Sequence, residues 1–104
     1  MDGRAQLSPA AGEVWLADRG DERRRLVFVI SDDRFQRLAE RAVVAPVLDE
    51  RPERPSPWHV PLGTRAIAVN HIATVSLERL LERVEVTPNE TLRQVRHALR
   101  AVAG

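Results

Sequence analysis

The chain has 104 residues, 43% of them hydrophobic, which suits one domain with a single core. Its 16 basic residues, all arginine, nearly balance 15 acidic ones for a formal charge of +1, so nucleic-acid binding by bulk charge is excluded and would need a local patch. The absence of cysteine excludes disulfides, thiol catalysis and cysteine-ligated metal, and suits a reducing cytoplasm.

The order of apolar runs and polar turns gives the expected elements. Residues 1–11 are small, polar and proline-containing, and we expect them to form a flexible tail ahead of a single domain at residues 12–104. They lack the apolar core of a signal peptide, and no apolar run reaches the roughly 20 residues of a membrane span. Short helical turns are expected within residues 32–41 and 76–81. The expected strands are residues 12–17, 26–31, 42–48, 58–62, 64–70 and 81–86.

The C-terminal segment predicts a helix that ends near Ala103. Thr87, Pro88 and Glu90 form a T-x-x-E capping box with proline at the first helical position. Many short strands followed by one helix indicate a mainly β fold, a small β-barrel with the helix packed on it. The apolar stripe of the expected helix is Leu92, Val95, Leu99 and Val102.

Three consecutive arginines, Arg23, Arg24 and Arg25, stand directly before the apolar strand at residues 26–31. In one interpretation they form a solvated turn and pair with neighbouring carboxylates. In the other, Arg25 is held rigidly at the start of a buried strand and can stabilise the extra charge of a pentacovalent phosphate.

A second candidate surface is the proline-rich loop at residues 49–57, which carries Arg51 and Arg54 and leads to Trp58. Arginines beside an aromatic ring can hold a single-stranded base by stacking. Trp58 could equally anchor the next strand in the core, and the sequence leaves both interpretations open.

Metal and cofactor sites are not expected. The histidines His59, His71 and His97 share no ligand spacing such as i, i+4, and the glycines form no phosphate-binding loop.

The segments GEVWLAD, RLVFVISDD, AVVAPV and AIAVNHIATVSLERLLERVEVTP, followed by the terminal helix, resemble the MazF/PemK/Kid toxin family over roughly residues 12–102. The resemblance implies an SH3-like barrel with a C-terminal helix and a homodimer. It further implies metal-independent cleavage of single-stranded RNA by the toxin of a type II toxin–antitoxin system. A cognate antitoxin would cover the RNA site.

The same resemblance makes Arg25 the phosphate-binding catalytic arginine. The family's usual hydroxyl residue, just after the proline of the third strand, is missing after Pro46. Cleavage still needs a group that moves a proton, and Asp49, His59 or Glu13 could supply it. The residues expected to contact RNA are Arg24, Arg51, Arg54, Trp58 and Asn70.

Two alternatives remain open. The segments RRLVFVISDD and RAVVAPVLDERP also resemble CcdB-like gyrase poisons, although the chain lacks their C-terminal Trp-Gly-Ile. A barrel that binds RNA or a partner without catalysis is the third possibility.

Overall fold

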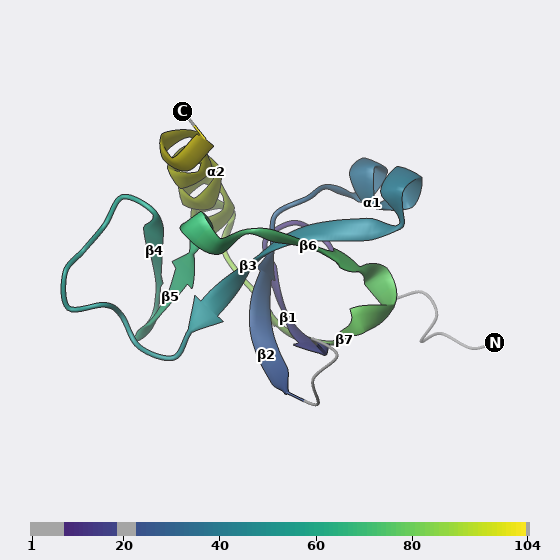
Figure 1. Ribbon diagram of the computed structural model, residues 1–104, viewed down its shortest axis with the longest axis horizontal. Helices are drawn as coiled ribbons and strands as arrows, with labels where there is room; N and C mark the ends of the chain where they lie inside the picture. Colours follow the sequence, from purple (N-terminus) through teal and green to yellow (C-terminus); the bar gives the residue numbers. More distant parts are fainter. Residues whose placement is uncertain (1–7, 19–22, 104) are drawn as a thin grey trace.

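The computed structural model of the protein describes residues 8–18 and 23–103, so most of the expected tail and the turn at residues 19–22 lie outside it. Strands and one long C-terminal helix make up most of the described chain (Figure 1). The strands are β1 (Glu13–Asp18), β2 (Arg24–Val29), β3 (Arg41–Leu48), β4 (His59–Leu62), β5 (Arg65–Ala68), β6 (Ala73–Ser76) and β7 (Leu80–Val86). The helical segments are α1 (Asp33–Ala39), the 3₁₀ turns η2 (Val69–His71) and η3 (Leu77–Arg79), and α2 (Asn89–Ala103).

The strands pair antiparallel in the order β4-β5-β3-β2-β1-β7. One edge of β3 pairs with β2, and the other edge pairs with β6 near its start and with β5 at its end. No backbone ladder between the described strands joins β4 to β7, but Arg65 of β5 forms an ion pair with Glu85 of β7 at 2.7 Å. The fold is therefore an incompletely closed barrel with a C-terminal helix, which confirms the predicted class.

Apolar side chains pack on both sides of the sheet, as expected for near-continuous apolar strands. On one side, Phe28 of β2 and Val95 of α2 are fully buried in the same cluster. On the other side, Val27 and Val29 of β2 pack in a cluster with Trp15 of β1. Burying each large side chain contributes about 1.5–3 kcal/mol. β2 thus contributes to two cores through residues 26–29, whereas Arg24 and Arg25 at its start are exposed.

The buried face of α2 follows the predicted stripe. Val95 and Ala98 are buried, Leu92 and Leu99 pack beside them, and Val102 at the end of the helix is 40% exposed. Neither α2 nor another described helix combines the length and apolar character needed to cross a membrane.

The predicted capping box of α2 does not form. The Thr87 N–H and the Thr87 hydroxyl both donate to the carbonyl of Gly12, at 3.0 and 2.6 Å. The N–H that Glu90 was expected to accept from is therefore occupied, and the Glu90 carboxylate pairs with Arg93 instead. Thr87 joins the start of the helix to the start of β1, a long-range contact that local sequence spacing does not encode.

Two differences in the strands affect the candidate site. The strand expected at residues 64–70 ends at Ala68, and the chain turns through η2, so Asn70 lies in a 3₁₀ turn. β6 was not predicted, because Ala73 and Thr74 are exposed and its four residues have no buried apolar alternation. Backbone pairing with β3 holds this strand in place.

The expected flexible tail is wrong for residues 8–11. Pro9 is buried, and its carbonyl accepts a hydrogen bond from Gln36 Nε2 at 2.6 Å. Gln36 Oε1 in turn accepts from the Ser31 hydroxyl at 2.8 Å. Because Gln36 is 2% exposed, these bonds are shielded from water and hold residues 8–11 against the domain.

Candidate functional site

The ladder between β1 and β2 sets the directions of the two arginines that begin β2. Arg24 lies opposite Asp18, and Arg25 lies opposite Ala17. Because side chains alternate along a strand, Arg25 shares a face with Val27, whereas Arg24 lies on the opposite face. The Arg25 side chain is exposed and has no hydrogen bond or ion pair within residues 8–18 and 23–103. Its guanidinium is therefore available to an anionic ligand.

A hollow of about 840 Å³ opens on the face of the sheet that carries Arg25. Ala17, the ladder partner of Arg25, and Val27, two residues along the same strand, form part of its wall. η2 contributes Asn70 and His71, both exposed. The remaining charged groups of the lining are Asp18, Arg41, Glu78 and Arg79. Two carboxylates and two guanidinium groups balance one another, so the nearby Arg25 adds net positive charge at the edge of the hollow.

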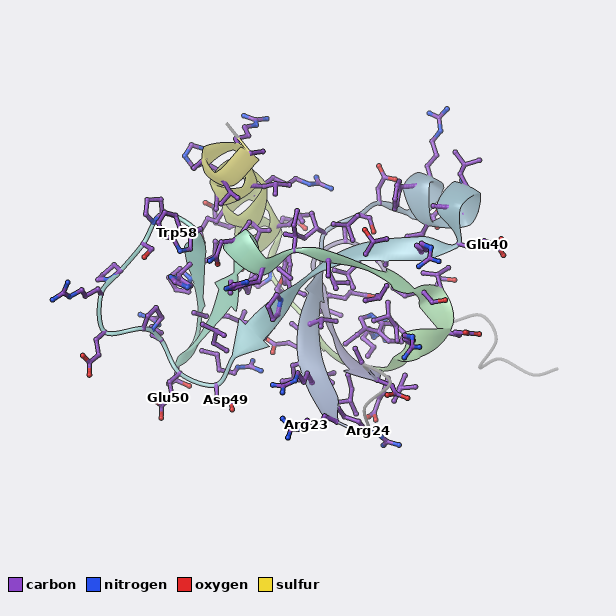
Figure 2. The ribbon with its side chains drawn as sticks, in the orientation of Figure 1. Arg23, Arg24, Glu40, Asp49, Glu50 and Trp58 are labelled. Carbon is purple, nitrogen blue, oxygen red and sulfur yellow. The ribbon has the colours of Figure 1, made fainter. Side chains whose placement is uncertain are left out.

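Asp49 directly follows β3, whose end points toward the start of β2 because the two strands are antiparallel, and Figure 2 shows Asp49 on the same side of the molecule as Arg23 and Arg24. The ladder between these strands ends at the Val27–Pro46 pair, after which β3 pairs with β5 and the strand ends diverge (Figure 1). Arg51 Nε donates to the carbonyl of Gly63 at 2.8 Å, which fixes the loop after β3 to the turn between β4 and β5. Arg51 thus has a structural contact of its own.

The rest of this loop presents exposed side chains. Arg54 is exposed and Trp58 is 37% exposed, so Trp58 does not anchor the core. The Trp58 ring lies 6.3 Å from the His59 ring, centroid to centroid. Figure 2 shows Trp58 near α2, at the opposite end of the loop from Asp49 and Glu50. The loop is a second exposed surface, and none of its residues lines the hollow.

His59 faces α2. A cleft of about 460 Å³ between β4 and α2 is lined by His59 and Pro61 from the strand and by Arg93 and His97 from the helix, among others. The His59 Nδ1 atom is buried and has no hydrogen-bond partner in the described part of the chain. The structure therefore does not bring His59 to the hollow beside Arg25.

Glu13 is held in a buried network of hydrogen bonds. Its Oε1 accepts from the Ala10 N–H at 2.8 Å and from Trp15 Nε1 at 2.9 Å, and its Oε2 pairs with Arg83 Nη1 at 3.3 Å. Glu13 is 7% exposed. A carboxylate with three donors in place is a structural acceptor, which leaves Glu13 poorly placed to move a proton.

Of the residues expected from the sequence, Asn70 lines the hollow and Arg25 lies beside two of its lining residues, Ala17 and Val27. His71 lines the hollow without having been predicted. Adjacent residues of a strand face opposite sides, so a strand through residue 70 would have separated Asn70 from His71. The 3₁₀ turn η2 brings both to the hollow. Among the described residues, no group of three or more histidine, aspartate or glutamate side chains is placed to hold a metal ion.

Nearly the whole described chain is similar to proteins of one known family. Residues 10–103 match the family described as a PemK-like, MazF-like toxin of type II toxin–antitoxin systems. No curated protein matches the sequence.

Solved structures share the fold at low sequence identity. An endoribonuclease in complex with its cognate antitoxin, from a mycobacterial species, superposes with a TM-score of 0.81 at 20% identity, over 93% of this chain and 96% of that one. A second mycobacterial endoribonuclease gives 0.81 at 19% identity, over 94% and 93%. A chain of a MazE–MazF crystal structure from Deinococcus radiodurans gives a TM-score of 0.77 at 23% identity, over 94% of this chain and 97% of that one.

Proposed function

Because this chain belongs to the PemK-like, MazF-like toxin family of type II toxin–antitoxin systems, we propose that it is an endoribonuclease that cleaves single-stranded RNA without a metal ion. The observation that carries the proposal is the place of Arg25, a guanidinium with no partner among the residues that the structure describes, beside a hollow that one or more nucleotides can enter.

In the proposed reaction, the RNA 2′-oxygen attacks the adjacent phosphorus, and the bond from phosphorus to the 5′-oxygen breaks. The products are a 2′,3′-cyclic phosphate and a free 5′-hydroxyl. Arg25 donates hydrogen bonds to the phosphate oxygens as their negative charge increases. Its position at the start of β2 supports this role, because a preorganised donor needs little rearrangement during the reaction.

RNA beyond the cleaved bond would extend over exposed residues outside the hollow. Asn70 lines the hollow and would hydrogen-bond a base there. Arg54 and Trp58 offer a cation and an aromatic face on which a neighbouring base can stack. Arg24, Arg51 and Asp49 remain predicted participants at the ends of β2 and β3.

The proposed partners are a second copy of the chain and a cognate antitoxin, in the cytoplasm where RNA is translated. The solved relatives include a complex of an endoribonuclease with its antitoxin. Exposed apolar side chains offer surface for both partners. They include Ile72 beside the hollow and Leu81, Val84 and Val86 on the edge strand β7. Light scattering at micromolar concentration should give the mass of a dimer, and a monomer would contradict this assembly.

The activity is tested by incubating the purified protein with a long single-stranded RNA in the presence of a chelator. Discrete fragments that end in a cyclic phosphate, with gyrase supercoiling unaffected, are expected. Intact RNA together with trapped gyrase–DNA complexes would favour a gyrase poison. Intact RNA with unaffected gyrase would favour a barrel that binds without catalysis.

A further inference from the structure

The proposed function leaves the proton transfer unassigned, and the hollow contains a group suited to it. We propose that His71 is the catalytic acid–base residue of this RNA site. The proposal rests on the proposed function and adds to it a residue that the sequence did not single out.

The first observation is the position of His71. It ends η2 and lines the hollow together with Asn70. η2 contacts β3, and Pro46 of β3 lines the same hollow and is the ladder partner of Val27. Arg25 lies two residues before Val27 on the same face of β2. Two residues along a strand and two steps between neighbouring elements separate the Cα atoms of Arg25 and His71 by roughly 12–15 Å. Their long side chains can therefore bracket one phosphodiester group.

The second observation is that the imidazole is free. The His71 side chain is exposed and has no hydrogen bond or ion pair with any residue the structure describes. The other titratable groups of the hollow are the carboxylates Asp18 and Glu78 and the guanidinium groups of Arg41 and Arg79. Carboxylates and guanidinium groups are ordinarily charged at neutral pH, whereas an imidazole both accepts and donates a proton there.

In the proposed reaction, His71 makes both of the proton transfers that cleavage requires. The neutral His71 imidazole accepts the proton of the 2′-hydroxyl as the 2′-oxygen bonds to phosphorus. The imidazolium donates that proton to the 5′-oxygen as its bond to phosphorus breaks. Arg25 neutralises the charge that accumulates on the phosphate oxygens between these steps. No metal or further reactant is needed.

The test compares His71→Gln with His97→Gln. His97 is also an exposed histidine, but it lies on α2 and does not line the hollow. A cleavage site is mapped on a long single-stranded RNA, and a short oligonucleotide that spans it is used for single-turnover rates. The same oligonucleotide with a 2′-deoxy sugar at the cleaved position cannot react and reports affinity.

His71→Gln should lower the cleavage rate by about 10²–10⁴-fold, the range for loss of an acid–base group, with unchanged affinity for the deoxy analogue. The rate of the wild type should fall in acid as the imidazole becomes protonated, and His71→Gln should lose this dependence. His97→Gln should match the wild type in all three measurements.

A His71→Gln rate within a few-fold of the wild type, a loss confined to affinity, or an unchanged acidic limb would each overturn the proposal. The first two outcomes would leave the endoribonuclease function standing. A wild type that cuts no RNA would overturn both the function and the role of His71. Circular dichroism of each variant checks that the fold is intact.

Discussion

Trp15 Nε1 donates a hydrogen bond of 2.9 Å to Glu13 Oε1, and both side chains are buried at the start of the barrel. The same carboxylate binds the Ala10 N–H and Arg83, so Glu13 joins the N-terminal segment, β1 and β7. The buried Glu13 carboxylate is therefore the shared acceptor of three hydrogen-bond donors.

Replacing this acceptor should destabilise the fold without removing the chemistry. Glu13→Gln places an amide where a charge meets three donors, and we expect a loss of about 1.5–3 kcal/mol in the free energy of unfolding. Urea denaturation measures it, with Glu82→Gln on the exposed side of β7 as the control, expected within about 0.5 kcal/mol of the wild type. Loss of cleavage by a fully folded Glu13→Gln protein would contradict a purely structural role.

The second prediction concerns Arg25. Arg25→Ala should lower the rate of RNA cleavage by about 10²–10³-fold, because a preorganised charge donor is lost. Arg93→Ala removes the same charge from the exposed face of α2 and should change the rate little. Single-turnover cleavage of one oligonucleotide compares the two. Equal losses, larger at low salt, would mean that bulk electrostatics governs RNA binding and that Arg25 has no special role.

A third prediction follows from the buried amide of Gln36. Gln36→Ala leaves the Pro9 carbonyl and the Ser31 hydroxyl without this partner. It should lower the free energy of unfolding by about 1–3 kcal/mol. The N-terminal segment should also become more open to proteolysis. Gln94→Ala, at an exposed position of α2, is the matched control. Equal protease resistance of both variants would show that other contacts hold residues 8–11 in place.

The ion pair between β5 and β7 should be weak but measurable. Arg65 and Glu85 side chains are 27% and 38% exposed, so a double-mutant cycle of Arg65→Ala and Glu85→Ala should give a coupling of about 0.2–1 kcal/mol that shrinks in high salt. A coupling of zero at low salt would mean that the two flanks of the barrel are joined by packing alone.

The elements with strong local signals could be predicted from the sequence. The apolar runs of β2 and β3 and the stripe of α2 are dictated by burial, and the structure has them close to their expected bounds. Features that depend on distant partners could not be predicted. β6 exists because the edge of β3 is open to it, and Thr87 binds Gly12 across 75 residues.

In the candidate site, too, some residues could be predicted from the sequence and others could not. Arg25 could be singled out because charge directly before a buried strand is a local pattern. His71 could not, because its access to the hollow depends on a 3₁₀ turn in a segment that reads as strand. Asp49 and His59 were chosen for their chemistry. Asp49 lies just beyond the part of β3 that pairs with β2, and His59 lines the cleft beside α2 and not the hollow.

The ladder between β1 and β7 pairs Glu13 with Val86, two residues that lie far apart in the sequence. β1 leaves the ribosome before β7, the last of the described strands in chain order, and its outer edge stays uncovered until β7 follows. Pairings of such long sequence separation form late and slowly. A nascent chain therefore lacks a finished barrel until β7 has left the ribosome, so the folded domain appears only after all of residues 13–86 have been synthesised.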